Sequence, residues 1–178
     1  MNSKRFFVIL SVLLALVPMT AFGGNLHSAG AVYVMTNAPK VNEVVVFERN
    51  FRGRLTLTDS FATEGAGSGG GIDPLGSQGA LILSTNQRWL IAVNAGSDNI
   101  SSYKVRAADG QVQLWENIAA EGNKPIDIAT TASGRYLYVL NAADGSVGAF
   151  RVLPFGFLKV LGTVAGLPLL SAQGIAAR

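Results

Sequence analysis

Few side chains in this sequence could perform acid–base or nucleophilic chemistry. His27 is the only histidine, the one side-chain type that titrates near neutral pH without help from its surroundings. It could act as a base, but its position near the amino-terminal end favours a solvated surface residue. Asp73 could polarise a water molecule or bind a metal ion, although Pro74 beside it favours a turn. The sequence contains no cysteine, which excludes thiolate catalysis, zinc–thiolate sites and disulfide bonds.

Two short motifs imitate functional sites. Residues 65–70 (Gly-Ala-Gly-Ser-Gly-Gly) match the dinucleotide fingerprint, but Ile-Asp-Pro at 72–74 starts no helix that could hold a phosphate. We therefore expect residues 66–77 to form a mobile loop rather than a nucleotide-binding loop. Residues 99–101 (Asn-Ile-Ser) form a glycosylation sequon that has meaning only in a eukaryotic secretory host, and we interpret them as a turn. Neither motif predicts a bound cofactor.

The first 23 residues have the layout of a secretory signal. Lys4 and Arg5 precede an apolar run from Phe6 to Val17, and a small-residue site at residues 21–23 follows. The apolar run is shorter than the roughly 20 residues that span a bilayer, so export is preferred to a membrane anchor. We expect cleavage near Gly23, no membrane attachment afterwards, and a secreted or periplasmic protein.

Composition and charge describe a globular protein with little attraction for nucleic acid. The chain has 178 residues, of which 49% are hydrophobic and 14% charged. Removing the leader takes away two of its 14 basic residues and none of its 11 acidic ones, which leaves a net charge of +1. The remaining basic residues are scattered along the sequence rather than gathered in a stripe. We therefore expect no nucleic-acid partner.

A repeated unit organises the chain after the leader. Residues 88–95 (Arg-Trp-Leu-Ile-Ala-Val-Asn-Ala) return at 135–142 (Arg-Tyr-Leu-Tyr-Val-Leu-Asn-Ala), and residues 33–38 (Tyr-Val-Met-Thr-Asn-Ala) are an earlier copy. The asparagines that close the copies are separated by 57 and then by 47 residues. A glycine-rich insertion between residues 65 and 78 accounts for the longer first spacing.

Each unit contains two apolar strands followed by two strands in which apolar and polar residues alternate. A strand that is apolar on both faces needs cover on both, which sheets packed face to face provide. The pattern predicts an all-β chain, a β-propeller of four-stranded blades with about three blades present. An immunoglobulin-like sandwich explains the repeated units less well. The predicted strands are 31–37, 44–48, 55–61, 80–84, 89–94, 100–105, 112–116, 126–129, 136–141, 147–152 and 158–164.

These repeats resemble the lactonase family of seven-bladed β-propellers, which includes 6-phosphogluconolactonase and carboxymuconate-cyclase-like proteins. The resemblance is carried by the three copies that end at Asn37, Asn94 and Asn141, and by Gly-Ser-Gln-Gly at 76–79 and Ser-Ala-Gln-Gly at 171–174. It covers residues 31–178. It implies a propeller fold and hydrolysis of a lactone without an obligatory redox cofactor.

The units do not complete a seven-bladed ring. We expect a leader at 1–23 and a partial propeller at 24–178, the N-terminal portion of a longer protein. A short natural protein that closes its ring by self-association is the alternative. Expressed alone, residues 24–178 should self-associate, because apolar surface and strand edges stay uncovered. The expected divisions are blade one at 31–64 without its innermost strand, blade two at 78–121, blade three at 125–166 and the start of blade four at 171–178.

One face of the predicted propeller collects the candidate ligand-binding residues. In a four-stranded meander, the loop that enters the innermost strand and the loop between the second and third strands lie on the same face. The candidates are Asp73, Gln78, Asp127 and Gln173; the last three lie at or near the starts of innermost strands and could hydrogen-bond the oxygens of a lactone. Asparagine and glutamine at strand ends also satisfy backbone groups, and we assign that structural role to the asparagines that recur in every unit.

The leading hypothesis is an exported lactonase-like propeller that hydrolyses a sugar or other lactone in its complete form. The alternatives are a propeller that binds a small molecule or a protein without turnover, and an inactive fragment. No short motif assigns a catalytic residue, and we expect neither a metal nor a cofactor. Trp89, in a strand that is apolar on both faces, is interpreted as core, and Trp115 as packing at a sheet edge.

Overall fold

The computed structural model describes residues 28–69, 79–169, 171 and 173–178, and the expected leader lies outside them. Within these ranges the chain forms β strands and one short 3-10 helix, and no helix has the length and hydrophobicity needed to cross a bilayer. The elements are β1 (Ser28–Met35), β2 (Glu43–Asn50), β3 (Leu55–Ala62), β4 (Leu81–Leu83), β5 (Trp89–Asn94), β6 (Asn99–Val105), β7 (Val112–Ala119), β8 (Pro125–Thr130), β9 (Tyr136–Asn141), β10 (Ser146–Val152), η3 (Pro154–Gly156) and β11 (Leu158–Gly166).

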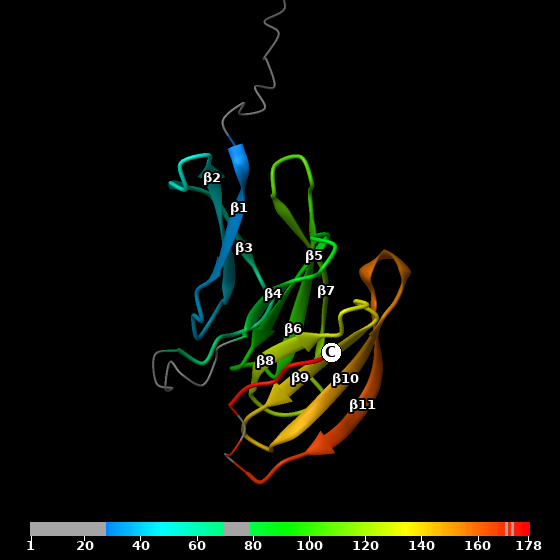
Figure 1. The fold of residues 1–178 in the computed structure, drawn as a ribbon. Coiled ribbons are helices and arrows are strands. Elements are labelled where there is room, and N and C mark those ends of the chain that lie inside the picture. Colours follow the sequence, from blue (N-terminus) through cyan, green and yellow to red (C-terminus); the bar gives the residue numbers. More distant parts are fainter. Residues whose placement is uncertain (1–27, 70–78, 170, 172) are drawn as a thin grey trace, which may run out of the picture.

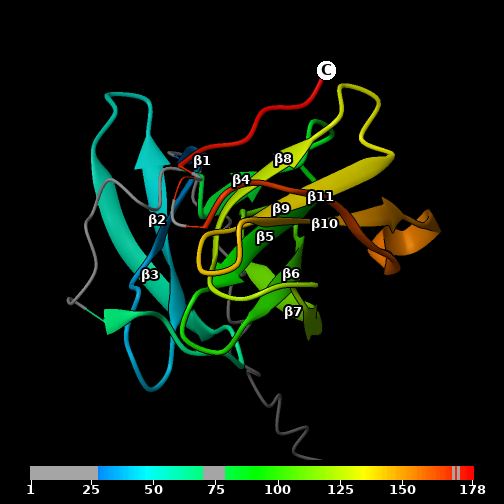
Figure 2. The ribbon, with the colours of Figure 1, turned by 90° about the horizontal axis from the view of Figure 1, so that it is seen from below.

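The strands form three antiparallel sheets in which chain neighbours are also sheet neighbours. The strand orders are β1-β2-β3, β4-β5-β6-β7 and β8-β9-β10-β11. Figures 1 and 2 both place the second sheet between the other two, as successive blades of a propeller are placed. The predicted all-β fold of four-stranded units is therefore confirmed.

The second sheet is covered on both faces because β5 divides its side chains between two cores. Leu90 belongs to the same core as Val44 of the first sheet. Ile91, the next residue, belongs to the same core as Leu137 and Phe150 of the third sheet. Successive side chains of a strand point to opposite faces, so one strand contributes to both interfaces. This is the physical reason why β5 is apolar from Trp89 to Val93.

The outer strands of the first and third sheets have much less cover. Leu55 and Leu57 of β3 are 47% and 61% exposed, and Val160 and Val164 of β11 are 43% and 54% exposed. These side chains lie on strands that end their sheets. Uncovered apolar side chains at two sheet ends are the structural basis for our prediction that residues 24–178 self-associate when expressed alone.

Candidate functional site

The recurring asparagines on the predicted binding face hold the loops of that face together. Asn94 is fully buried, and its Oδ1 accepts a hydrogen bond of 2.9 Å from Nδ2 of Asn42, in the connection between β1 and β2. Its Nδ2 donates to Asn99 Oδ1 at 2.7 Å and to Ser101 Oγ at 2.8 Å. Every polar atom of the Asn94 side chain is thus used inside the protein, as expected for a structural residue.

Asn141 occupies the equivalent position in the third sheet but is less well bonded. Its Nδ2 donates to Ser146 Oγ at 3.1 Å and to the Ala120 carbonyl at 3.4 Å. Its Oδ1 is buried and has no hydrogen-bond partner among the described residues. The same residue in two units therefore forms networks of different strength.

A glycine lies against each of these two asparagines, Gly65 at the end of the first unit and Gly122 at the end of the second. A Cβ on Gly65 would lie 2.5 Å from Asn94 Nδ2, and a Cβ on Gly122 would overlap Asn141 Nδ2. Any larger side chain would push the asparagine away from its partners.

The first part of the glycine-rich insertion is fixed between two units, which corrects the expectation of a mobile loop for that part. Gly67 N donates to the Ala38 carbonyl at 2.7 Å, and Ser68 N donates to Asn37 Oδ1 at 2.8 Å. On the other side, Gly96 N donates to the Ala66 carbonyl at 2.9 Å. A Cβ on Gly67 would overlap the backbone of Asn37, so this glycine permits close backbone approach. Residues 70–77 lie outside the described ranges.

Asp127 is the candidate residue whose surroundings the structure describes most fully. It lies on β8 and is 6% exposed. Its Oδ1 accepts from Ile128 N at 2.8 Å, and its Oδ2 accepts from Ile175 N at 3.0 Å. Ile128 N also donates to the Gly79 carbonyl at 3.1 Å. The Asp127 carboxylate therefore lies at the start of β8, between the residues that precede β4 and the C-terminal segment at 173–178.

Of the other ligand-binding candidates, only Gln173 lies within the described residues. A Cβ on Gly79 would overlap Asp127 Oδ1, and a Cβ on Gly174 would lie 3.4 Å from Oδ2. Gln173, directly before Gly174, is exposed. Gln78, directly before Gly79, falls outside the described ranges, as do Asp73 and His27. Gln173 therefore lies two positions before Ile175, whose backbone N–H binds Asp127. The remaining candidates have no described position.

Other carboxylates on this face have structural partners. Asp98 Oδ1 accepts from Lys124 N at 2.6 Å, and Asp144 Oδ2 accepts from Asn123 N at 2.8 Å, so both hold the loop that enters β8. Burial opposes ionisation of Asp144, but hydrogen bonds from the hydroxyl and N–H of Ser146 and from Asn123 N outweigh it and lower the pKa of Asp144. In the described ranges, no group of three or more His, Asp and Glu side chains could hold a metal ion.

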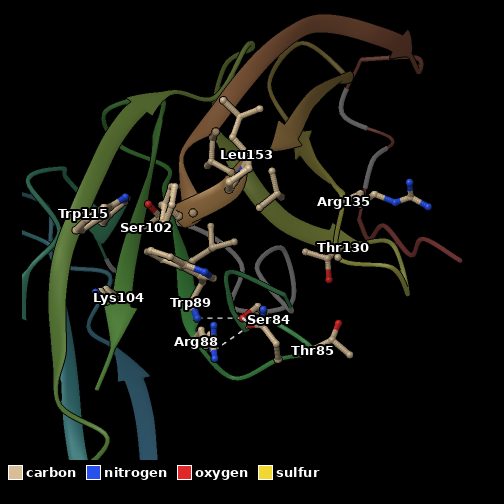
Figure 3. Close-up of a pocket in the computed structure, with 18 of the residues that line it drawn as sticks. Ser84, Thr85, Arg88, Trp89, Ser102, Lys104, Trp115, Thr130, Arg135 and Leu153 are labelled. Carbon is tan, nitrogen blue, oxygen red and sulfur yellow. Dashed lines mark hydrogen bonds between the residues drawn. The ribbon is translucent and has the colours of Figure 1, made fainter. Parts of the chain in front are cut away.

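A groove of about 820 Å³ lies on the opposite face, between the second and third sheets, and the sequence did not predict it. The hairpins β4–β5 and β8–β9 and the connection through η3 form its walls (Figure 3). Trp89 lines this groove and is only partly buried, which corrects its interpretation as core. It is the first residue of β5, at the end of the sheet where the groove opens.

Aromatic and cationic side chains form much of the groove. The ring centroids of Trp89 and Trp115 are 5.6 Å apart, and that of Phe157 lies 5.4 Å from Trp115. The Nζ of Lys104 lies 5.5 Å from the Trp115 ring centroid, within cation–π range. Trp115 thus packs at the sheet edge as its position predicted. The groove can accept a small molecule by size.

Comparison with known proteins agrees with the propeller fold. The family described as "Lactonase, 7-bladed beta-propeller" matches residues 27–156. The periplasmic gluconolactonase PpgL of Pseudomonas aeruginosa is similar to this chain with a TM-score of 0.57 and 27% sequence identity, over 72% of this chain and 34% of that chain. A protein from Lactobacillus plantarum has a TM-score of 0.60 and 17% identity, over 82% of this chain and 43% of that chain. The similarity to the Lactobacillus plantarum protein concerns the fold alone. No curated protein matches the sequence.

The chain spans about a third of the gluconolactonase and less than half of the Lactobacillus protein. The family match covers more than half of the present chain, and its repeats, sheets and blade-to-blade cores are those of a propeller. The chain belongs to the family of lactonases that fold as seven-bladed β-propellers.

Proposed function

We propose that this protein, as part of a complete propeller, hydrolyses a sugar lactone or a related lactone on the face where its innermost strands begin. Membership of the lactonase family and similarity to a periplasmic gluconolactonase support this reaction. The single structural observation that supports the location is the buried Asp127 carboxylate, which lies at the start of β8 and binds the backbone N–H of Ile175 in the C-terminal segment.

Lactone hydrolysis needs a water molecule that attacks the carbonyl carbon and donors that stabilise the resulting oxyanion. An ionised carboxylate only accepts hydrogen bonds, so Asp127 would bind the attacking water or a sugar hydroxyl rather than the lactone carbonyl. The Gln173 side-chain amide can donate and is the better candidate for contact with the carbonyl oxygen. This division of roles refines the expectation that Gln78, Asp127 and Gln173 all bind lactone oxygens.

We also propose that the protein is exported. The basic, apolar and small-residue segments within residues 1–23 support a cleaved signal, and PpgL is a periplasmic protein. Mass spectrometry of the protein recovered from the periplasm or medium should give an amino terminus near Gly24. Recovery of exported protein that still carries Met1 would contradict cleavage.

The reaction is tested by following the opening of glucono-1,5-lactone in a weakly buffered solution, where the acid product lowers the pH. The full-length gene product should accelerate opening above the spontaneous rate, with saturation at high lactone concentration. A rate equal to that of buffer, measured on monodisperse folded protein with several sugar lactones, would refute the proposal.

The competing function is ligand binding without turnover, and one observation favours it. A groove of about 820 Å³ lies on the opposite face, where Asp127 does not lie. Saturable binding there without lactone hydrolysis would favour this function.

A further inference from the structure

The loops of this protein divide into two faces that differ in charge. The five loops that connect β2–β3, β4–β5, β6–β7, β8–β9 and β10–β11 lie on the face opposite Asp127, which we call the hairpin face. These loops are residues 51–54, 84–88, 106–111, 131–135 and 153–157. They contain five arginines and one aspartate, a net charge of +4. The described loops between strands on the other face contain two lysines and four acidic residues.

We propose that the hairpin face binds peripherally to the surface of a bilayer that contains anionic phospholipids. This departs from the sequence-based expectation of no membrane attachment, because the arginines are scattered along the sequence and only the fold brings them to one face. The proposal does not rest on the lactonase reaction, which concerns the other face.

Most arginines of the hairpin face are available to an anionic partner. Arg106 is paired with Asp109. The other four are exposed and form no salt bridge within the described ranges; they are Arg52, Arg54, Arg88 and Arg135. Planar guanidinium groups suit the oxygens of phosphate, the group that anionic phospholipids present at their surface. Basic side chains close to such a surface each strengthen attachment to it.

Two exposed phenylalanines lie on the same face as the arginines. Phe51 and Phe155 lie in the β2–β3 and β10–β11 hairpins and are 76% and 81% exposed, more than Leu57 or Val164 of the outer strands. Figure 1 shows both hairpins projecting toward the upper side of the view. A neighbouring blade covers the faces of a sheet rather than the tips of its hairpins. A complete ring would therefore leave these two rings exposed.

Phe155 also has a backbone conformation that is unfavourable for phenylalanine. Its φ is 68°, in the left-handed region, which costs stability for a bulky side chain. Glycine or asparagine would adopt this conformation at lower cost. Because the ring is exposed, it adds little to the core in return. Contact with something outside the chain is the simplest reason for a phenylalanine at this position.

A bilayer fits this combination better than a folded protein partner does. Phe51 belongs to the first sheet and Phe155 to the third, and Figures 1 and 2 place the second sheet between them. The two rings therefore do not form the continuous apolar patch that a protein interface buries. Separate projecting tips can each insert a ring between lipid headgroups while the arginines bind phosphate groups around them. Peripheral binding strengthens with buried apolar area and with attraction to anionic lipid.

Binding is measured by flotation of vesicles in a sucrose gradient, which separates bound protein from protein that has only self-associated. The full-length gene product is used after export and removal of its leader, because the apolar run from Phe6 to Val17 would itself bind lipid. Vesicles of one part phosphatidylglycerol to two parts phosphatidylcholine are compared with vesicles of phosphatidylcholine alone. We expect flotation only with the anionic vesicles, and release at about 1 M sodium chloride, where the screening length is about 3 Å.

Two double variants test the arginines. Arg52→Gln with Arg54→Gln removes two charges from the hairpin face, while Lys40→Gln with Lys124→Gln removes the same charge from the other face. The arginine variant should need at least about tenfold more anionic lipid for half of the protein to float, which corresponds to about 1.4 kcal/mol. The lysine variant should float like the wild type.

Two further double variants test the phenylalanines. Phe51→Asn with Phe155→Asn removes both rings, and asparagine tolerates the left-handed backbone at position 155. Val164→Thr with Leu169→Thr is the matched control, because it removes exposed apolar side chains from β11 and the segment that follows it. The phenylalanine variant should also need about tenfold more anionic lipid, and the control should float like the wild type.

Four results would overturn the proposal. The first is no flotation with anionic vesicles at low salt. The second is equal weakening in the arginine and lysine variants, which would mean attraction by net charge alone. The third is unchanged flotation of the phenylalanine variant. The fourth is tighter binding to double-stranded DNA than to the vesicles, which would assign the face to nucleic acid. Far-ultraviolet circular dichroism of each variant, together with its unfolding midpoint, excludes loss of folding as the cause of weaker binding.

Discussion

Replacing Asn94 by alanine is expected to destabilise the protein more than the same change at Asn141, although both asparagines are fully buried at equivalent positions. Asn94→Ala removes three hydrogen bonds, of 2.7, 2.8 and 2.9 Å. At about 0.5–1.5 kcal/mol each, their loss amounts to about 1.5–4.5 kcal/mol. The variant also leaves Nδ2 of the buried Asn42 without its acceptor, which adds to the cost.

Asn141→Ala removes only two hydrogen bonds, both longer than those of Asn94, at 3.1 and 3.4 Å. It also removes the buried Oδ1 that has no partner among the described residues, and this offsets part of the loss. We expect a decrease in the free energy of unfolding of about 1 kcal/mol.

Both values are obtained from urea unfolding followed by circular dichroism, on monodisperse protein with equal m-values. A free-energy loss for Asn141→Ala that equals or exceeds that for Asn94→Ala would refute the argument. It would mean that burial of the side chain, and not its hydrogen-bond network, sets the cost.

Three further changes test other contacts. Gly79→Ala should displace the Asp127 carboxylate and release the C-terminal segment, seen as faster proteolysis after residue 170. Gly156→Ala should lower the unfolding midpoint more than Gly134→Ala, because both have positive φ but only the first would drive a Cβ into a tryptophan ring. Burial, with a smaller effect of a nearby carboxylate, raises the pKa of Tyr103, so stability should fall as pH rises above about 10, and Tyr103→Phe should make that fall smaller.

The fold was predictable because the repeat carries two independent signals. The asparagine that ends each copy marks the same place in each unit, and the order of apolar and alternating strands gives the blade. β5 shows why: it is apolar from Trp89 to Val93 because Leu90 and Ile91 face different sheets. A strand buried on both faces has a continuous apolar run, and such a run can be recognised in a single sequence.

The wrong predictions concern residues whose type is compatible with two different structural roles. Glycines at 66–69 suggested mobility, but Gly67 is needed for close approach to the backbone of Asn37. Trp89 was assigned to the core from its strand, although the first residue of a strand can lie at an open end of the sheet. The groove itself was missed because its lining comes from several strand ends and connections that lie far apart in the sequence.

The most direct test of the central claim, that lactone hydrolysis takes place beside Asp127, is the ratio of kcat/KM for two carboxylate variants. Asp127→Asn keeps the shape of the side chain but removes its charge, and Asp59→Asn makes the same change on exposed β3. If Asp127 positions or activates the attacking water, kcat/KM for glucono-1,5-lactone should fall about a hundredfold or more in Asp127→Asn and stay unchanged in Asp59→Asn. Equal kcat/KM in the two variants, with both folded, would contradict the claim.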